Sequence, residues 1–217
     1  MVCSCNENLG LAWSDSPTGP FVPVQDKILY PGSIDGHLFV DDDGKVYLYF
    51  VSWNGRPYGI YGVRLDAEMN PTGIPKLIVK PTEEWEKNRN GVTEGPYMLK
   101  RDGVYYMTYS GSDYQSEYYA VGYATASSPL GEFRKYALNP VMVGNTQIHG
   151  TGHHCFVTLP DGQLMIVYHC HNTLTEVQER KICIDRARFA QDLNGKTRLE
   201  VYGPSVTPQP YPLPKSK

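Results

Sequence analysis

Three ionisable residues occupy the same place in three successive stretches of the chain. Asp35, Glu94 and His153 are 59 residues apart, and each stands nine positions before the glycine of an Asp-Gly pair. Carboxylates held close together raise one another's pKa, which keeps one carboxyl group protonated near neutral pH. The alternative is that each residue caps a strand or satisfies local backbone groups. Because strand capping does not require three ionisable residues at one repeated position, we favour a shared functional site.

An internal repeat of 59 residues must position these side chains. The Asp-Gly pairs begin at Asp43, Asp102 and Asp161, and each joins two apolar, strand-like runs as the turn of a hairpin does. A third strand-like run follows in every repeat. The expected strands are 35–40, 46–50 and 59–65, then 94–99, 105–109 and 119–125, then 153–158, 164–168 and 182–189. Repeated units of three or four strands are typical of β-propeller blades.

The fold class follows from this repeat. In a propeller the first strand of every blade lines the central channel, so equivalent positions should converge around the axis. Residues 9–21 also match 121–133, which end a blade, so residues 9–21 should end a blade that begins outside this chain. We therefore expect an all-β, incomplete propeller with its first blade largely missing, as one partial domain over residues 1–217 with a Pro-rich exit at 204–214.

Composition excludes several classes of partner. The formal net charge is −3 and no basic run is present, which argues against nucleic acid as a ligand. No stretch approaches the roughly 20 apolar residues that span a bilayer, so no membrane partner is expected. The five cysteines are an odd number and several lie in apolar runs, which weakly favours a reducing, cytoplasmic location. The oligomeric state stays open.

Aromatic residues near the shared position suggest a carbohydrate ligand. Carboxylates in a cleft lined by Tyr and Trp are suited to hydrolysis of glycosidic bonds, where an acid protonates the leaving oxygen. Trp53 and Trp85 lie in loops after and before the expected channel strands, and with Arg180 they are our candidates for substrate binding. The alternative for both tryptophans is ordinary packing.

The chain resembles glycoside hydrolase family 43, five-bladed propeller enzymes that act on arabinose- and xylose-containing polymers. The resemblance is carried by Ser33-Ile34-Asp35, Phe39-Val40-Asp41-Asp42-Asp43-Gly44, Thr93-Glu94-Gly95-Pro96-Tyr97, Gly150-Thr151-Gly152-His153 and Ser16-Pro17-Thr18-Gly19-Pro20-Phe21. It implies an inverting glycosidase in which Glu94 is the general acid and Asp35 the carboxylate that modulates its pKa. It also implies that His153 is an axial histidine near a central calcium or sodium ion, which the chemistry itself does not require.

The general base has no counterpart in the sequence. The family carries it on the first strand of the first blade, and one step of 59 residues back from Asp35 falls before Met1. Asp15 lies in a turn-like Ser-Asp-Ser-Pro context, and we do not give it this role. We expect a truncated chain, with completion of the ring by another chain as the alternative. A chain without the base would be an inactive fragment or a noncatalytic, carbohydrate-binding propeller.

Three further features of the sequence have competing explanations. His169 and His171 alternate along one expected strand and share a face, which buried strand residues explain more simply than zinc does. Asp41-Asp42-Asp43-Gly44 lacks the ligand spacing of an EF-hand and is better explained as a solvated turn. A phosphorylase or lyase on a similar propeller is a second rival function, but phosphate would need clustered basic residues at the channel, and few are present. The sugar, the linkage and exo or endo action stay open.

Overall fold

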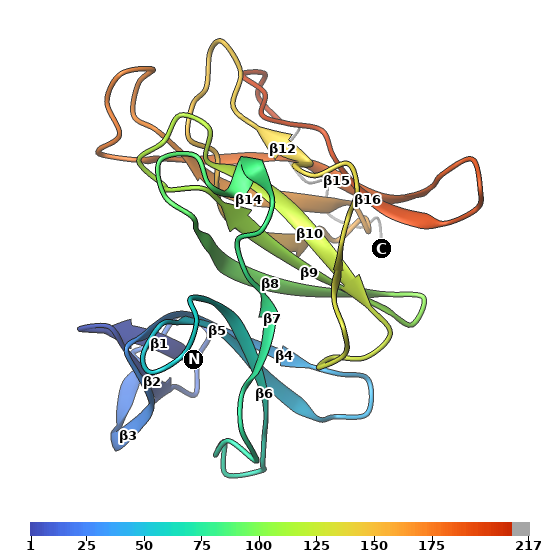
Figure 1. Ribbon diagram of the computed structural model, residues 1–217. Helices are drawn as coiled ribbons and strands as arrows, with labels where there is room; N and C mark the ends of the chain where they lie inside the picture. The colour runs from blue at the N-terminus through green and yellow to red at the C-terminus, as the bar shows by residue number, and fades with distance from the viewer. Residues whose placement is uncertain (210–217) are drawn as a thin grey trace. The chain divides into compact units, whose positions relative to one another are not determined.

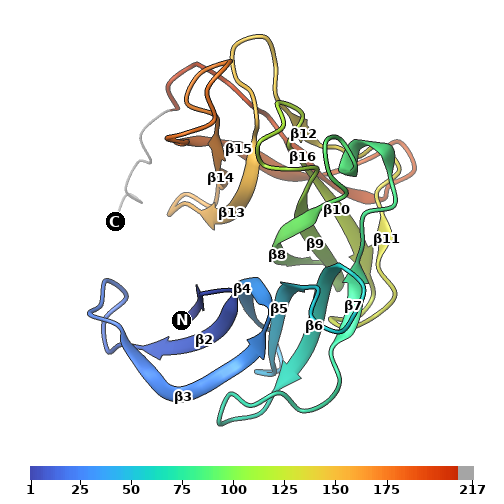
Figure 2. The ribbon, with the colours of Figure 1, turned by 60° about the vertical axis from the view of Figure 1, so that its left-hand side comes forward.

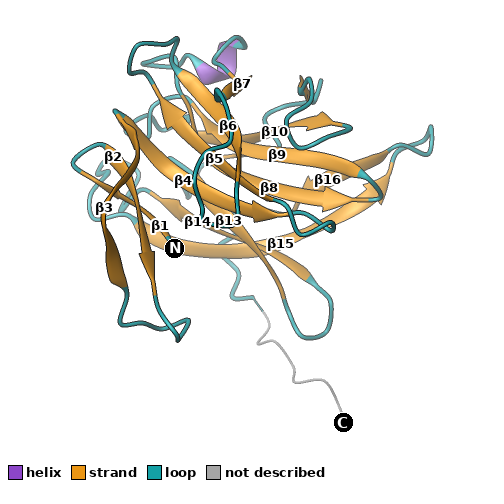
Figure 3. Cartoon of the chain, turned by 90° about the horizontal axis from the view of Figure 1, so that it is seen from below, coloured by secondary structure: helices purple, strands orange, loops and turns teal. Residues whose placement is uncertain are grey.

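The computed structural model describes residues 1–209, apart from the side chains of residues 25–27. Strands dominate this part of the chain (Figure 3), and its one helix is the short 3-10 turn η1 (Glu84–Glu86). No helix in the described residues is therefore long enough to cross a membrane. The prediction of an all-β chain is confirmed. The Pro-rich segment 204–214 lies partly outside the described residues.

The described strands form four sheets, whose elements follow one another along the chain (Figure 1). The first sheet consists of β1 (Val2–Cys5), β2 (Asn8–Trp13) and β3 (Val22–Pro31). The second consists of β4 (Ser33–Val40), β5 (Val46–Ser52), β6 (Gly59–Leu65) and β7 (Lys76–Val79). The third consists of β8 (Thr93–Arg101), β9 (Val104–Gly111), β10 (Ala120–Ala126) and β11 (Arg134–Lys135), with β12 (Met142–Val143) also paired with β10.

The fourth sheet has the same meander as the second. Its strands are β13 (Gly152–Thr158), β14 (Leu164–Cys170), β15 (Lys181–Gln191) and β16 (Thr197–Val201), and each pairs with the next in antiparallel fashion (Figure 2). All nine strands predicted from the repeat are present, displaced by at most two residues at any end. The prediction of repeated hairpin units is confirmed.

The Asp-Gly pairs form the predicted turns, although not all of one type. Asp102 and Gly103 both have positive φ, of 52° and 75°, as a two-residue type I′ turn requires. In the first and third repeats only the glycine has positive φ: 77° at Gly44 and 91° at Gly162. The Gly44 N–H donates to the Asp41 carbonyl at 2.9 Å, which gives a longer turn. Glycine suits all three positions because it enters this region without steric cost.

The matched segments after β2 and β10 also have one local structure. The Gly19 N–H donates to the carbonyl of Ser16 at 3.1 Å, and the Gly131 N–H donates to that of Ser128 at 3.0 Å. β2 therefore matches β10, the third strand of its repeat, in the turn that follows it as well as in its sequence. The first sheet has three described strands, and β1, which the sequence did not predict, pairs with β2.

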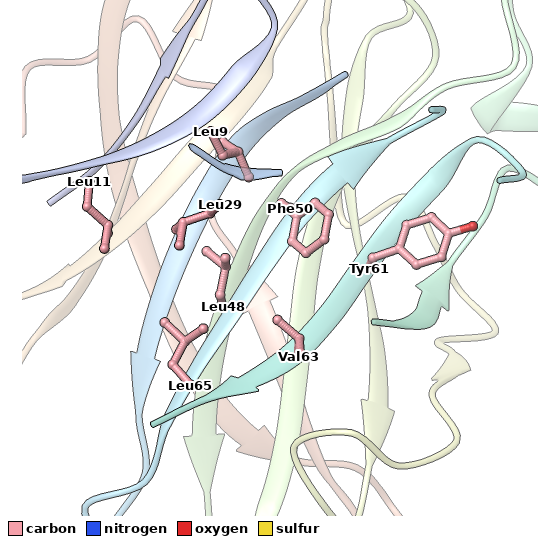
Figure 4. Close-up of a cluster of buried hydrophobic side chains, with 8 residues drawn as sticks. All are labelled: Leu9, Leu11, Leu29, Leu48, Phe50, Tyr61, Val63 and Leu65. Carbon is pink, nitrogen blue, oxygen red and sulfur yellow. The ribbon is translucent and has the colours of Figure 1, made fainter. Parts of the chain in front are cut away.

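The described chain divides into two compact units. The first contains residues 1–81, 92–108 and 124–134, and the second contains 82–91, 109–123 and residues from 135 onward. The first unit has a core between its first two sheets, in which side chains alternate inward along each strand. Figure 4 shows this cluster, which consists of Leu9, Leu11, Leu29, Leu48, Phe50, Tyr61, Val63 and Leu65. The assignment of residues 1–217 to a single domain stays a prediction.

The acidic turn of the first repeat is only partly solvated. Asp41 is buried, with 9% of its surface exposed, and it accepts a hydrogen bond from the Tyr105 hydroxyl at 2.6 Å. It also forms an ion pair with Lys100, whose ammonium group contacts Asp42 at 2.8 Å. These bonds hold the pKa of Asp41 below its usual value against the opposing effect of burial. The expectation of a solvated turn is correct for Asp42 but not for Asp41.

Candidate active site

The shared ionisable position is a β-bulge in two of the three repeats. The register between β4 and β5 shifts between Ile34 and His37, and the register between β13 and β14 shifts between Gly152 and Cys155. Asp35 and His153 lie within these bulges. Bulges are common beside active sites, because the extra residue redirects a side chain out of the regular alternation. Two of the three repeats therefore share a β-bulge as well as an ionisable residue at the same position in the strand.

Both bulge residues have a left-handed backbone. The φ angle is 57° at Asp35 and 49° at His153, a region that residues other than glycine seldom adopt. In the second repeat Glu94 is not left-handed, and Gly95 after it is, with a φ of 56°. Conformations of this kind cost free energy and gather at functional sites. This observation adds independent weight to a functional role for the shared position.

Asp35 and Glu94 are brought together within the first unit. The Gly95 N–H donates to Oδ2 of Asp35 at 3.1 Å, so the carboxylate of one repeat contacts the residue that follows the carboxyl group of the next. Strands β4 and β8 touch, and the rings of His37 and Tyr97 are 4.4 Å apart. Both Asp35 and Glu94 are half-buried. The repeat thus places two carboxyl groups in one neighbourhood.

The first sheet supports the Asp35 backbone from the other side. The Asp35 N–H donates to the Ser4 hydroxyl of β1 at 3.2 Å, which satisfies a donor that the bulge removes from the strand pairing. A Cβ at Gly36 would collide with the side chain of Val2, so this position requires glycine for close packing. β1 therefore helps to hold the Asp35 bulge in place.

His37, two residues after Asp35 on β4, provides an uncharged ring. Burial lowers its pKa to about 4, because the charged imidazolium would lose hydration in this position. Its Nε2 is buried and has no hydrogen-bond partner among the described residues. At neutral pH this imidazole is therefore neutral and adds no positive charge beside Asp35. His37 could not be recognised from the sequence, because a lone histidine in a strand carries no distinct signal.

His153 and Arg180 line one cavity in the second unit. This cavity has a volume of about 380 Å³, and His169 and Gln178 complete its lining. The His153 N–H donates to the Ser110 hydroxyl at 2.8 Å, which anchors the bulged backbone. Two residues that the sequence analysis selected for different reasons therefore share a site. Asp35 and Glu94 lie in the first unit and His153 in the second, so the convergence of all three stays a prediction.

Arg180 is fixed at this cavity by two contacts. Its NH1 group donates to Nε2 of His169 at 3.1 Å, and its guanidinium carbon lies 5.0 Å from the centre of the Tyr114 ring. Burial is the main cause that lowers the pKa of His169 to about 3, followed by the charge of Arg180. His169 entered the sequence analysis only as a rejected zinc ligand. Nothing in the sequence around Gln178 or Tyr114 indicated that they belong here.

The described residues do not form a cage for a directly bound metal ion. No group of three or more His, Cys, Asp or Glu side chains among them is arranged to hold one. Calcium and sodium prefer several oxygen ligands, whereas His153 offers an imidazole nitrogen. His171 uses its Nε2 on the Tyr114 carbonyl at 2.9 Å, and His169 is bound to Arg180. An ion near His153 stays a prediction, and the chemistry below does not involve it.

Trp85 has the contacts of a packed residue. Its ring packs against Gly111 and Gly122, where an added Cβ would collide with the indole. The ring also stacks on that of Tyr109, with centroids 5.7 Å apart. Its indole N–H donates to Glu83 at 2.6 Å. These contacts correspond to the packing alternative that the sequence left open. A role for Trp85 in substrate binding stays a prediction.

Trp53 is more exposed. It follows β5 in a loop, 36% of its surface is accessible, and its ring stacks on Tyr58 with centroids 6.4 Å apart. An accessible, braced indole is able to receive the apolar face of a sugar ring. Asp15 is also exposed, but it lies in the bend after β2, in agreement with its interpretation as a turn residue. We assign no general base among the described residues.

Comparisons with known proteins support this picture of the fold. The chain superimposes on the crystal structure of a thermostable family-43 glycoside hydrolase with a TM-score of 0.87, at 33% identity. The match covers 98% of this chain and 72% of that one. Family-43 neighbours are five-bladed β-propellers, so the prediction that this chain contains part of such a propeller is confirmed.

Curated relatives are similar over a shorter share of their own length. The chain is 33% identical over 191 residues to beta-D-galactofuranosidase xynD of Aspergillus niger, which covers 83% of this chain and 52% of that protein. It is 32% identical over 171 residues to a beta-xylosidase of Xylanibacter ruminicola, which covers 65% of this chain and 52% of that protein. The chain thus spans about half the length of these relatives.

The sequence profile of one family matches nearly the whole described chain. This profile, glycosyl hydrolases family 43, aligns with residues 2–193, which include all four sheets up to β15 and every candidate site residue. The repeat, the paired carboxyl residues and the structural likeness agree with this match, and the chain belongs to glycosyl hydrolases family 43.

Proposed function

We propose that this chain carries the acid part of the active site of an inverting glycoside hydrolase. Its substrates are arabinose- or xylose-containing plant polysaccharides or oligosaccharides, Glu94 is the general acid, and Asp35 is its pKa modulator. One observation carries the proposal: Oδ2 of Asp35 accepts the N–H of Gly95 at 3.1 Å, which ties the carboxylate to the residue next to Glu94.

The chemistry requires a proton on one carboxyl group and a charge on the other. In an inverting hydrolysis, Glu94 gives its proton to the glycosidic oxygen as the bond to the anomeric carbon breaks. A base on the opposite face of the sugar takes a proton from the attacking water in the same step. Asp35 does not exchange protons with substrate. Its negative charge favours the protonated form of Glu94, and its bond to Gly95 fixes the distance at which that charge acts.

The substrate class rests on family membership and on the relatives' names. One relative is named for a galactofuranoside and the other for a xyloside. Trp53 offers an accessible aromatic face, and Arg180 with Gln178 offers hydrogen bonds for hydroxyl groups. Each of these features, taken by itself, suits an uncharged sugar.

Hydrolysis of substrates with different leaving groups tests the role of Glu94. Protonation matters most for a poor leaving group, so in a protein that also carries the general base Glu94→Gln should lower turnover of xylobiose by a factor of about 10² to 10⁴. Turnover of 2,4-dinitrophenyl β-D-xyloside, whose leaving group needs no proton, should fall much less. Glu84→Gln is the matched control, because the Glu84 side chain is 94% exposed and its change should affect neither substrate.

Two outcomes would contradict the proposal. Equal losses on both substrates would show that Glu94 does not act as an acid. Binding of xylobiose or arabinobiose without any hydrolysis, by a protein that also carries the general base, would instead support the alternative function, a noncatalytic carbohydrate-binding propeller.

A further inference from the structure

Arg180 is exposed, yet its guanidinium group is held in place. It donates one hydrogen bond to Nε2 of His169 at 3.1 Å and lies over the Tyr114 ring at 5.0 Å. A long, exposed arginine without such contacts samples many rotamers, and that freedom is lost when a ligand binds. An arginine that is ordered beforehand binds its ligand more tightly because this loss has already occurred.

The direction of this hydrogen bond defines the state of His169. A guanidinium group has five N–H donors and no acceptor, so Nε2 of His169 must carry the lone pair and the proton must be on Nδ1. Burial favours the same neutral imidazole, in agreement with its pKa of about 3. In this tautomer His169 is a neutral acceptor at neutral pH.

His169 is itself fixed by its strand, by the ring of Tyr119 and by that of His153, whose centroid lies 6.3 Å away. It lies opposite Gly152 in the pairing of β14 with β13, and its ring stacks on that of Tyr119 at 5.5 Å and 12°. A Cβ at Gly152 would collide with the Tyr119 ring, so glycine at this place gives the ring its room. The chain of contacts thus runs from Gly152 through Tyr119 and His169 to Arg180.

We propose that His169 is a positioning residue, which holds the guanidinium group of Arg180 ready for the hydroxyl groups of a sugar in the adjoining cavity. The inference rests on the proposed function, because it concerns the same substrate. Among the described residues His169 takes one of the five donors of Arg180. A planar fork of donors beside the Gln178 amide is suited to a pair of neighbouring hydroxyl oxygens.

The mobility of Arg180 without ligand is the first test. ¹⁵N relaxation of its Nε–H should show an ordered side chain in the wild type and a mobile one in His169→Phe, which keeps an aromatic ring but has no acceptor. His169→Gln, whose amide oxygen is able to accept the bond, should keep Arg180 more ordered than His169→Phe does. If Arg180 is equally ordered in His169→Phe and in the wild type, the inference is wrong.

Affinity for xylobiose, measured by calorimetry, is the second test. His169→Phe should bind about fivefold to tenfold more weakly, the loss expected when one long side chain must be ordered on binding, and His169→Gln should recover most of this. In an Arg180→Ala background, His169→Phe should have no further effect, whereas additive losses would overturn the inference. If the wild type binds neither xylobiose nor arabinobiose, the proposed function fails, and the relaxation measurement still decides whether His169 positions Arg180.

Discussion

Trp85 offers a clear choice between a structural and a substrate-binding role. Its ring covers Gly111 and Gly122, stacks on Tyr109 and is tied to Glu83 through its indole N–H. Trp85→Ala should leave a void over both glycines and remove the indole donor from the Glu83 carboxylate. Replacement of a large buried aromatic by alanine costs about 3 to 5 kcal/mol. Because this indole is only half-buried, we expect about 3 kcal/mol.

Urea denaturation followed by circular dichroism measures this loss. With a dependence of about 2.5 kcal/mol per molar urea, the midpoint should fall by about 1 M. Trp53→Ala is the matched control, because the Trp53 ring is exposed and has one stacked neighbour, which suggests a cost of about 1 kcal/mol. Affinity for xylobiose should show the opposite order, with a larger loss for Trp53→Ala than for Trp85→Ala. A stable Trp85→Ala variant with reduced sugar affinity would refute this reasoning.

Three further changes test the packing and charge of the two units. Gly152→Ala should cost about 1 to 3 kcal/mol in thermal denaturation, because the added Cβ displaces the Tyr119 ring, and an unchanged melting temperature would contradict this. Tyr109→Phe should cost about 1 to 3 kcal/mol of stability, because it removes the hydroxyl that donates to the fully buried Glu86 at 2.7 Å. Tyr118→Phe is the control and should be neutral, because the Tyr118 ring is 53% exposed. Equal effects of the two changes would argue against the hydrogen bond to Glu86. The pKa of His37 is about 4 in the folded chain, against a usual value of 6.5. Between these two pH values the unfolded chain binds a proton that the folded chain does not bind. Stability therefore falls as the pH falls through this window. Between pH 6 and pH 5 the free energy of unfolding of His37→Phe should therefore fall by about 1 kcal/mol less than that of the wild type. Parallel curves of stability against pH would show that His37 does not titrate in this way.

The repeated strands could be predicted because their signals are local. Asp-Gly turns at fixed spacing define the hairpins, and alternating apolar residues define the faces of their strands. β1 was not predicted, because Val2-Cys3-Ser4-Cys5 has too few apolar residues for an alternating pattern. Its strand form depends on pairing with β2 and on the two positive-φ residues, Asn6 and Glu7, that turn between them.

The candidate site was only partly visible in the sequence. The repeat indicated that Asp35 and Glu94 would be neighbours, and Asp35 contacts the residue after Glu94. The left-handed bulges at Asp35 and His153 could not be foreseen, because strand register is a property of paired strands rather than of one segment. The bond from Arg180 to His169 likewise depends on how β14 and β15 pair.

The amide proton of Gly95 reports most directly on the juxtaposition of Asp35 with Glu94. Because this N–H donates to the Asp35 carboxylate, its NMR chemical shift should follow the ionisation of a carboxyl group as the pH is varied. The largest part of that change should disappear in Asp35→Asn and persist in Glu94→Gln. A Gly95 amide that is insensitive to pH, or that is unaffected by Asp35→Asn, would show that the two repeats do not bring these carboxyl groups together.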